Sequence, residues 1–317
     1  MESEISSNIA ALPFISIIIP VYNRPEQIVR LLKTLVIQQY LQHKFEIIIV
    51  DDGSTDTTVS VAQKFLEENA QQANNVPIAF TIISKSNGGP ASARNFGAAA
   101  AHGEILAFID SDCLASPGWL RSLADVFTEN TCAGAGATIV NQGSGTWTAN
   151  YLVHSHFYRH RVKNGVVEYL VTINAAFRKT DFARLNGFHI FDDVWNEDAD
   201  LSFKLRSSGA TLAVTDSSQV FHTGIPATTL ALSAELRRYG YGAAVLAKNW
   251  PGRSPVKELL RHAGACVLAP YVAAKILRGA PLSEKIGAIP LVVIEHGSFC
   301  VGLLQGMFHS SKHPTTK

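Results

Sequence analysis

Four short apolar runs, each the length of a β-strand, constrain the fold of this chain more than any other feature. They are rich in Ile, Val and Phe, show little polar alternation, and occupy residues 14–19, 45–50, 78–83 and 105–109. Runs of this kind are typical of parallel strands that are buried on both faces. Because amphipathic segments separate them, repeated strand–helix–strand units predict an α/β fold with an open, doubly wound, mostly parallel sheet and flanking helices.

Helical patterns fill the intervals between these strands. In the first interval, Pro25–Gln38 places its leucines on one face, and Asn23 is the expected N-cap. The second helix is expected to begin near Ser54 or Asp56, and the third to span Ala91–Ala101. Ligands of doubly wound sheets bind at the carboxyl ends of the strands, so functional side chains are expected there.

The rest of the chain has a different character. Residues 1–13 are interpreted as an N-terminal tail. Residues 114–227 contain short strands, glycines and loops, with one clear helix that is expected to begin near Asp198 and to stop at Gly209. The pattern becomes helical again from residue 228 onward.

Composition excludes several classes of function. The 317 residues carry 27 Lys and Arg against 26 Asp and Glu and contain no basic run, so a nucleic acid is not expected as a partner. Four scattered cysteines without a CxxC pair argue against a zinc ribbon or a disulfide framework and fit a reducing compartment. Glu2 and Glu4 stand where a secretory leader would carry Lys or Arg, so we expect a cytoplasmic domain.

Carboxylates at successive strand ends are the strongest chemical signal. Asp51 and Asp52 end the second strand, and Asp110 and Asp112 end the fourth. These ends share one rim of a doubly wound sheet, so the acids are expected to converge. A cation such as Mg²⁺ or Mn²⁺ is held by carboxylates together with phosphate oxygens, and an Asp-x-Asp at a strand end suits that role. Asp56, by contrast, is expected to cap a helix.

Two further segments carry chemistry. Ser86–Asn95 joins the third strand to a helix with small early residues, which let a backbone and a ligand approach closely, and Arg94 can serve a nucleotide or its phosphates. Glu197, Asp198 and Asp200 open the later helix, where one acid can cap the helix and another can act as a base towards an acceptor hydroxyl.

These segments, in this order, resemble glycosyltransferase family 2, whose fold is of the GT-A type. The matching stretches lie within about residues 14–222 and are Ile17–Arg24, Val50–Asp56, Asn87–Asn95, Phe108–Asp112 and Glu197–Leu201. The resemblance implies that a hexosyltransferase-class enzyme moves a sugar from a nucleoside-diphosphate donor in one inverting displacement. It also implies that residues 14–113 are the nucleotide-sugar-binding half of one domain and residues 114–227 its acceptor-binding and catalytic half.

The resemblance assigns residues to the donor side of the site. Asp51 or Asp52 would hold the base of the nucleotide. Asp112, with Asp110, would hold Mg²⁺ or Mn²⁺ on the diphosphate, where the ion would act as a Lewis acid. The remaining nucleotide-sugar-binding positions are Pro20, Tyr22, Asn23, Arg24, Gly89, Arg94 and Ser111.

It also assigns residues to the acceptor side and to the diphosphate. Asp198 would deprotonate the acceptor, with Glu197 as the second choice. Asn174 and Ala175 fall where the family lines the pocket for the donor sugar and the acceptor. His222 matches a late histidine near the diphosphate, so it is a third candidate metal ligand, although a lone histidine is as often structural.

Residues 228–317 form a C-terminal helical region with two apolar segments, 262–277 and 286–308. The second is long enough to span a bilayer, for which about 20 residues suffice. It contains Pro290 and Glu295, however, and a charge within a span is costly. Packing on the catalytic domain, lying in the membrane interface and forming a hairpin in the bilayer are the three interpretations. We favour contact with the inner face of the cell membrane, which would suit a lipid-linked acceptor.

The sequence thus predicts an inverting glycosyltransferase that acts on a saccharide or lipid-linked acceptor in exopolysaccharide or cell-envelope glycan synthesis. The alternatives are a polyprenyl-phosphate glycosyltransferase and, from another class, a non-catalytic binding or scaffold protein with the same fold. A sugar nucleotidyltransferase would show a Gly-rich loop after the first strand, where Pro20–Arg24 has no glycine. A Rossmann dehydrogenase is excluded because no G-x-G-x-x-G follows that strand.

Overall fold

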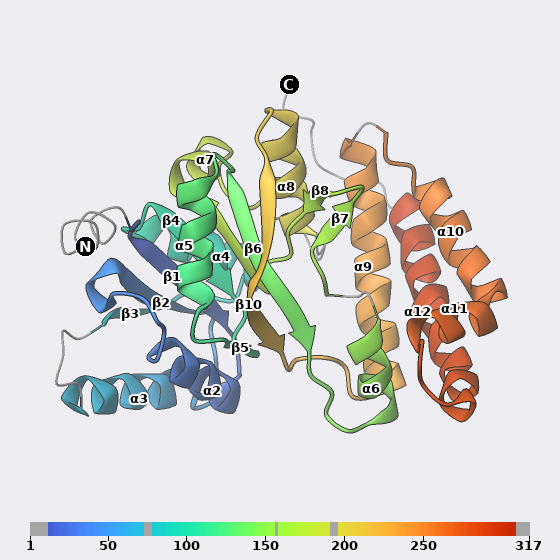
Figure 1. Ribbon diagram of the computed structural model, residues 1–317, viewed down its shortest axis with the longest axis horizontal. Helices are drawn as coiled ribbons and strands as arrows, with labels where there is room; N and C mark the ends of the chain where they lie inside the picture. Colours follow the sequence, from blue (N-terminus) through green and yellow to red (C-terminus); the bar gives the residue numbers. More distant parts are fainter. Residues whose placement is uncertain (1–11, 73–77, 156–157, 191–195, 251, 309–317) are drawn as a thin grey trace. The chain divides into compact units, whose positions relative to one another are not determined.

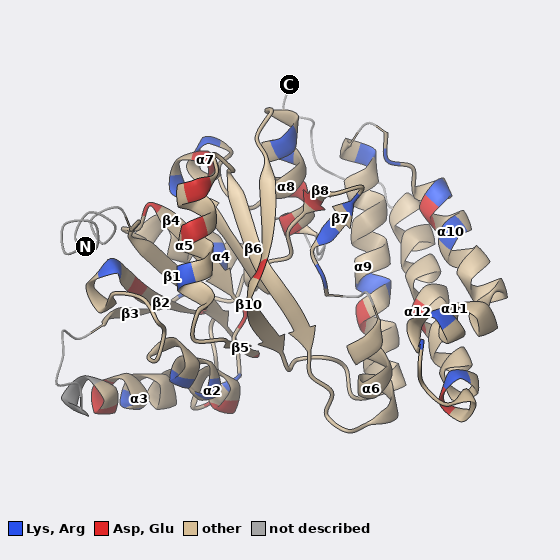
Figure 2. Ribbon diagram, viewed as in Figure 1, with Lys and Arg blue, Asp and Glu red and all other residues tan. Residues whose placement is uncertain are grey.

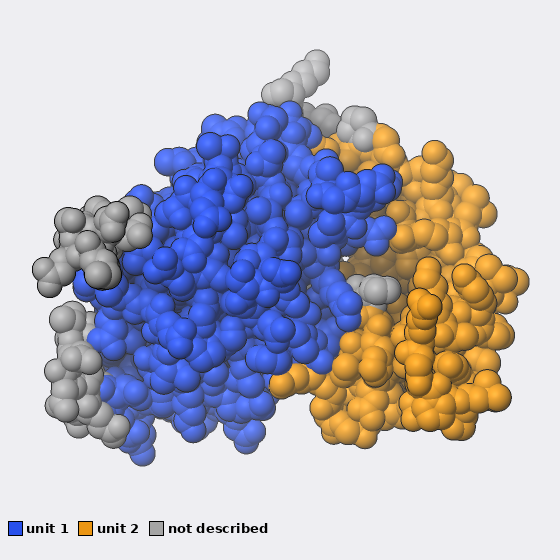
Figure 3. All heavy atoms as spheres, viewed as in Figure 1, with its two compact units in different colours: residues 1–141, 158–190, 197–224 blue, residues 142–157, 191–196, 225–317 orange. Residues whose placement is uncertain are grey.

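The structure is a computed structural model that describes residues 12–72, 78–155, 158–190, 196–250 and 252–308 (Figure 1). Most of the predicted tail, residues 1–13, therefore lies outside the described residues. By its internal contacts the chain forms two compact units, which Figure 3 shows in different colours. Unit 1 comprises residues 1–141, 158–190 and 197–224, and unit 2 comprises residues 142–157, 191–196 and 225–317.

Unit 1 is built on an eight-stranded mixed sheet with the strand order β3-β2-β1-β4-β9-β6-β10-β5. The strands are β1 (Ile15–Val21), β2 (Phe45–Asp51), β3 (Ala79–Ser84), β4 (Ile105–Ile109), β5 (Cys113–Ala115), β6 (Gly134–Asn141), β9 (Asn174–Arg178) and β10 (Leu212–His222). The four predicted strands are confirmed to within two residues at each end. Four of the seven strand pairings are parallel, and the antiparallel ones all involve strands that follow β4. The predicted α/β fold with a mostly parallel sheet is therefore confirmed.

Helices flank this sheet, and a two-stranded ribbon extends from it (Figure 1). The helices of unit 1 are α2 (Pro25–Leu35), a 3₁₀ turn η1 (Gln42–Lys44), α3 (Thr58–Gln72), α4 (Gly89–Ala100), α5 (Trp119–Glu129), α7 (Lys179–Arg184) and α8 (Glu197–Ser207). The ribbon pairs β7 (Arg161–Lys163) with β8 (Val166–Tyr169). The predicted early helices all exist, but α3 begins later and α2 ends earlier than the sequence pattern suggested.

The start of α2 differs from the prediction. Arg24, not Asn23, occupies the N-cap position, and its side chain makes no capping hydrogen bond. Asn23 has a positive φ of 49°, and its Oδ1 instead accepts a hydrogen bond from the backbone N–H of Thr55 at 2.9 Å. Asn tolerates this left-handed conformation because its short polar side chain can bond locally. Asp56 does serve the start of α3, since its Oδ1 accepts from the N–H of Thr58 at 2.9 Å.

Helix α4 lies very close to the sheet. A Cβ atom added at Gly97 would lie 2.6 Å from Cγ2 of Ile18 and 2.8 Å from Cγ2 of Val50, so only glycine fits at this contact. Ile18 and Val50 belong to the continuous apolar core that also contains Phe108 and Phe177. This close contact fixes the position of the polar residues on the preceding turns of α4.

Unit 2 is helical. Its helices are α6 (Trp147–His154), α9 (Thr229–Asn249), α10 (Pro255–Val267), α11 (Ala269–Ile276) and α12 (Leu282–Phe308). Residues 142–155 and Asn196, which the resemblance placed in the catalytic half, group by contacts with the C-terminal helices. The apolar segment 262–277 is not one helix: it breaks at Leu268, two residues before Pro270, which has no N–H to continue the helical bonding.

Helix α12 packs along α9 through glycines. A Cβ at Gly240 of α9 would lie 2.1 Å from the carbonyl oxygen of Phe299, and one at Gly302 would lie 2.0 Å from that of Arg237. Within the described residues, α12 is the one helix whose length and apolar composition would suffice to cross a membrane. That is weak evidence for a span, because a buried core helix passes the same test.

Candidate functional site

Asp51 organises the loops that follow β1 and β2. Its carboxylate is buried, and Oδ1 accepts a hydrogen bond from the N–H of Ser54 at 3.0 Å. The hydroxyl of Ser54 in turn accepts from the N–H of Asn23 at 2.9 Å, and the N–H of Arg24 donates to Oγ1 of Thr58 at 2.8 Å. The loop after β1 is thereby tied to the loop after β2, directly at the carboxyl ends of these parallel strands.

Asp52 holds the glycine loop that precedes α4. Its buried carboxylate accepts from the N–H of Gly89 at 2.8 Å and from the N–H of Gly88 at 3.0 Å, and it pairs with Nζ of Lys85 at 2.7 Å. Gly89 has a φ of +81°, a conformation that favours glycine. Two of the predicted nucleotide-binding positions, Asp52 and Gly89, therefore shape one loop together. Lys85 was missed by the sequence analysis because nothing in its local pattern shows its partner.

The loop after β1 carries exposed side chains at this rim, as do the loops after β2 and β3. Tyr22 is 47% exposed, Arg24 is exposed, and Pro20 and Asn23 are partly buried. An exposed aromatic ring beside a guanidinium can stack on a base and contact a phosphate. Tyr22 and Arg24 are accordingly the residues of the rim best placed to contact a ligand directly.

Arg94 bridges two carboxylates beneath the rim. Its buried guanidinium donates from Nη1 to Oε1 of Glu197 and from Nη2 to Oδ1 of Asp110, both at 2.6 Å. These two negative charges raise the pKa of Arg94, although its burial alone would lower it. Arg94 was expected to serve a nucleotide, whereas in the structure it connects the end of β4 to the start of α8. This connection could not be predicted from the sequence, because the three residues meet only in the folded chain.

Removing this cation should destabilise the fold. Arg94→Ala would leave Asp110 and Glu197 without their shared partner, and breaking a buried ion pair costs about 3–5 kcal/mol. We expect urea denaturation followed by circular dichroism to show a loss of that size. Arg121→Ala is the matched control, because Arg121 pairs with Asp125 on the surface and such pairs contribute about 1 kcal/mol or less. Equal losses for the two variants would contradict the structural role of Arg94.

Asp112 lies between the end of β4 and the start of β5, beside the end of β10. Its carbonyl oxygen accepts from the N–H and the hydroxyl of Thr223, and its carboxylate packs on the backbone of Gly224, where an added Cβ would lie 1.9 Å from Oδ2. Burial raises the pKa of Asp112, and the negative charge of Asp110 raises it further. The neighbouring His222, whose Nε2 is 3.8 Å from Oδ1 of Asp112, lowers this pKa. A carboxylate that is disfavoured as a lone charge is stabilised by a cation beside it.

The residues present fit a divalent cation that is completed by a ligand. Within the described residues, no group of three or more His, Cys, Asp or Glu side chains is arranged to hold a metal by itself. One oxygen of Asp110 is engaged by Arg94, and the ring of His222 packs against Tyr158 in a tilted arrangement with centroids 4.9 Å apart. Asp112 and Asp110 are similarly exposed, at 24% and 26% of their side chains, and Asp112 is the more available ligand because Arg94 occupies one oxygen of Asp110. Mg²⁺ is commonly held by so few carboxylates when phosphate oxygens supply the rest.

Asp198 and Glu197 have different environments although they are neighbours. Burial and the charge of Glu197 raise the pKa of Asp198 to about 7, while Oδ1 accepts from its neighbour Ala199 and Oδ2 from the N–H of Thr172 at 3.3 Å. Glu197 is buried and held by Arg94. The carboxylate with the raised pKa is the better proton acceptor at neutral pH, so the geometry favours Asp198 over Glu197 as a base.

Three expected site residues lie below the surface. Asn174 is fully buried at the start of β9, where its Oδ1 accepts from Nε1 of Trp119 at 2.8 Å and its Nδ2 donates to the carbonyl of Ala137 at 2.8 Å. Ala175 is also fully buried, and Ser111 nearly so. In this structure Asn174 and Ala175 support the end of β4, with which β9 pairs, rather than line an open pocket.

Two family models match the chain. The model of glycosyl transferase family 2 matches residues 16–185, and that of glycosyl transferase family group 2 matches residues 105–301. Together they include every residue described above at the rim.

Curated relatives match over about a third of the chain. Glycosyltransferase AglE of Haloferax volcanii is 38% identical over 112 residues, which are 35% of this chain and 34% of that protein. Validoxylamine A glucosyltransferase of Streptomyces hygroscopicus is 36% identical over 112 residues, or 35% of this chain and 23% of that protein. Poly(ribitol-phosphate) beta-N-acetylglucosaminyltransferase TarS of Staphylococcus aureus is 31% identical over 115 residues, which are 36% of this chain and 19% of that protein. The matched stretch is thus about a third or less of each relative.

A solved structure has a similar fold. It is the mannosyltransferase PcManGT from Pyrobaculum calidifontis in complex with GDP-Man and Mn²⁺, with a TM-score of 0.63 and 19% sequence identity. The match covers 94% of this chain and 88% of that one. At this identity the likeness establishes the fold.

Proposed function

Because the chain belongs to glycosyl transferase family 2, we propose that it transfers a sugar, with inversion, from a nucleoside-diphosphate sugar to an acceptor hydroxyl. The observation that carries this proposal is the chain of charges from Asp198 through Glu197, Arg94 and Asp110 to Asp112. It joins a carboxylate suited to accept a proton with a carboxylate suited to hold a cation. In an inverting transfer a base takes the acceptor's proton on one side of the reacting carbon, and a cation can neutralise the charge of the leaving group on the other side.

The donor would bind along the rim. Tyr22 and Arg24 are exposed for contact with the nucleotide, and Asp51 and Asp52 hold the loops beside it. Asp112, with Asp110 beside it, would hold Mg²⁺ or Mn²⁺, which when bound neutralises charge on a diphosphate leaving group. The similarly folded mannosyltransferase was solved with GDP-Man and Mn²⁺, which supports a donor and a cation of these kinds.

Asp198 would act as the base. The acceptor hydroxyl loses its proton to the Asp198 carboxylate as its oxygen forms a bond to the anomeric carbon. The bond from that carbon to the diphosphate breaks in the same step, and the electron pair leaves with the nucleoside diphosphate. A base with a pKa near the working pH combines a large deprotonated fraction with adequate basicity. The hydrogen bond from Thr172 holds one oxygen of the carboxylate in place.

For the acceptor we propose a broad chemical class and no single compound. The relatives are named for transfer to poly(ribitol-phosphate) and to validoxylamine A, so proteins similar to this chain over about a third of its length act on different acceptors. We place this chain in glycan synthesis with a saccharide or a lipid-linked acceptor, at the cytoplasmic face of the membrane. A panel of UDP-, GDP- and dTDP-sugars, assayed by release of the nucleoside diphosphate with Mn²⁺, tests the donor class. Release from none of them, with and without acceptor saccharides, would contradict the proposal.

The rate of transfer should depend on pH through Asp198. The pKa of about 7 belongs to a carboxyl that must be deprotonated to act, so kcat should fall as the pH decreases below about 7. We expect a slope of about one decade per pH unit on the acid side. In Asp198→Asn the residual rate should lose this acid limb. An acid limb that persists in the variant with the same midpoint would assign the ionisation to another group.

A further inference from the structure

Helices α10 and α11 of unit 2 carry an apolar stripe on their exposed side. The stripe on α10 consists of four exposed residues spaced three or four positions apart, namely Val256, Leu260, Ala263 and Val267. Tyr271 continues the row on α11. The largest exposed fractions are 81% for Val267, 68% for Leu260 and 67% for Tyr271. Such spacing places side chains on one face of a helix, and in a water-soluble helix that face is normally the buried one.

The opposite side of the same helices is already occupied. His262 of α10 is buried, and its ring stacks on Phe299 of α12 with centroids 4.1 Å apart. Ala269 and Ala273 of α11 are also buried. The two helices thus pack on α12 with one side and present a second apolar side outward.

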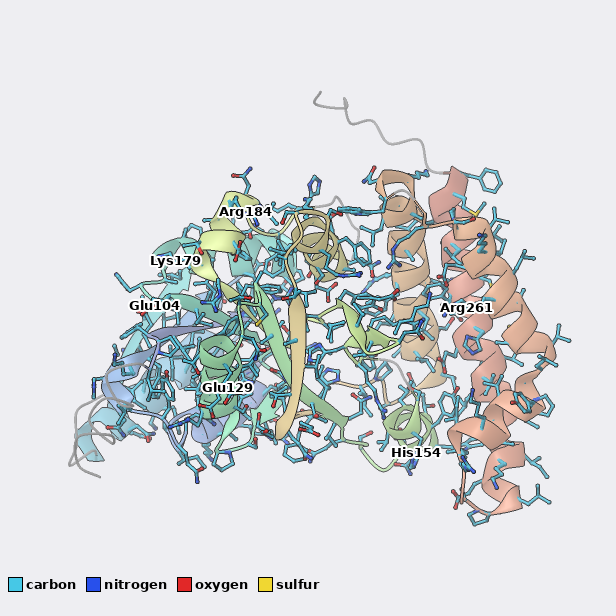
Figure 4. All side chains as sticks on the ribbon, turned by 45° about the horizontal axis from the view of Figure 1, so that its top comes forward. Glu104, Glu129, His154, Lys179, Arg184 and Arg261 are labelled. Atoms are coloured by element: carbon cyan, nitrogen blue, oxygen red, sulfur yellow. The ribbon has the colours of Figure 1, made fainter. Side chains whose placement is uncertain are left out.

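Basic residues flank the stripe. Lys257 and Arg261 lie beside it on α10, and Lys275 and Arg278 lie on and after α11; Figure 2 shows the basic residues of these helices, and Figure 4 labels Arg261. Charge is also distributed unevenly along the sequence as a whole. Residues 225–317 contain eleven Lys and Arg against four Asp and Glu, whereas residues 1–224 contain sixteen against twenty-two. The positive charge of the chain is therefore concentrated in the region that carries the exposed apolar stripe.

We propose that the outer side of α10 and α11 docks on the surface of an anionic membrane. An apolar stripe between Lys and Arg residues is the pattern of a helix that lies in the plane of a bilayer interface, with its apolar side chains below the headgroups and its cations among them. A contact between two copies of the chain would bury the apolar stripe equally well. It would, however, bring these like charges together, which disfavours it.

The contacts of α12 favour this arrangement over a span by that helix. Its carboxylate Glu295 accepts a hydrogen bond from the hydroxyl of Tyr151, Ser298 bonds to Ser233 at 2.8 Å, and the carbonyl of Gly306 accepts from Nζ of Lys248 at 2.9 Å. Along its length α12 is thus bonded to α6 and to α9, a helix that carries Glu235, Arg237 and Arg238. Moving α12 into lipid would break these bonds or bring charged side chains with it, which is costly.

Sedimentation of the purified full chain with vesicles tests the proposal independently of sugar transfer. The vesicles are phosphatidylcholine alone and phosphatidylcholine mixed with phosphatidylglycerol. We expect binding to the mixed vesicles that weakens as salt is added, because screening shortens the reach of the cations. The double variant Leu260→Glu with Val267→Glu should bind at least about tenfold more weakly. Lys275→Glu with Arg278→Glu should lose the preference for anionic lipid, since each cation near the surface contributes about fivefold.

Leu230→Glu is the matched control, because Leu230 is 75% exposed on α9, outside the stripe, and its replacement should leave binding unchanged. Unchanged donor binding and melting temperature would show that each variant is folded. Absence of vesicle binding by the unaltered chain would overturn the proposal, as would full binding by the α10 double variant. Light scattering without lipid separates the alternative: a dimer that the same variant dissociates, with no vesicle binding, would assign the stripe to a second copy of this chain.

Discussion

Asp112→Ala is expected to lower metal-dependent transfer by about 10³-fold or more while leaving the fold intact. A bound metal contributes several kcal/mol of charge stabilisation, and each 1.36 kcal/mol corresponds to a factor of about ten in rate. The fold should persist because burial raises the pKa of Asp112, so its charge is a cost in the absence of a cation. Its main-chain bonds with Thr223 do not depend on the side chain. The measurement is nucleoside diphosphate release at saturating donor, titrated with Mn²⁺.

Two further variants make this test specific. Asp112→Asn keeps the size of the side chain but removes its charge, and it should be nearly as impaired as the alanine variant. Asp216→Ala removes an exposed aspartate from β10 and should transfer sugar at the normal rate. Transfer by Asp112→Ala at an undiminished rate, with unchanged dependence on Mn²⁺, would show that the cation is held elsewhere.

Asp198→Asn is expected to lower kcat by about 10²–10⁴-fold, the usual contribution of a positioned general base. Binding of the donor should be nearly unchanged, because Asp198 is assigned to the acceptor side of the reacting carbon. The amide oxygen can still accept the bond from Ala199, and only the longer bond that Oδ2 accepts from Thr172 is lost, so the start of α8 should keep its structure. Single-turnover transfer, together with the dissociation constant of the nucleoside diphosphate, separates the two effects.

Glu197→Gln distinguishes the neighbouring carboxylate. Glu197 is held by Arg94, so this variant should mainly reduce stability and should affect kcat less than Asp198→Asn does. The reverse order, with transfer retained in Asp198→Asn and lost in Glu197→Gln, would make Glu197 the base. Comparable losses in both variants would mean that the pair acts as a unit.

The fold of the first hundred residues could be predicted because its signals are local. Each parallel strand is buried on both faces, so its apolar run is continuous and its limits are visible in the sequence. Ile105–Ile109, for example, is fully buried and matches the predicted strand at both ends. The positions of these carboxylates followed from the same pattern, since Asp51 and Asp52 lie at the end of β2, and Asp110 and Asp112 lie within three residues of the end of β4.

Features that depend on contacts between residues far apart in the sequence could not be predicted as well. The break of the apolar run 262–277 at Leu268 was not predicted, although Pro270 lies within the run, and the exposure of Val267 and Tyr271 was not predicted either. The N-cap assigned to Asn23 failed because its side chain is engaged by the loop after β2, which is over thirty residues away. The partners of Arg94 and Asn174 could not be predicted for the same reason, because they come from other strands and helices. Residue types indicated chemistry at these positions, while only the fold shows which side chains are available to a ligand.

The central claim is that the rim carrying Asp112 binds a nucleoside diphosphate together with a divalent cation. The most direct test is the thermal stability of the purified chain against UDP, GDP and dTDP, each with and without Mn²⁺ or Mg²⁺. A ligand at about a hundredfold excess over its Kd stabilises the folded protein by about 2.7 kcal/mol. We predict a rise in melting temperature with one of these nucleotides that requires the cation and is absent in Asp112→Ala. No shift with any nucleotide, or an equal shift in Asp112→Ala, would contradict the assignment.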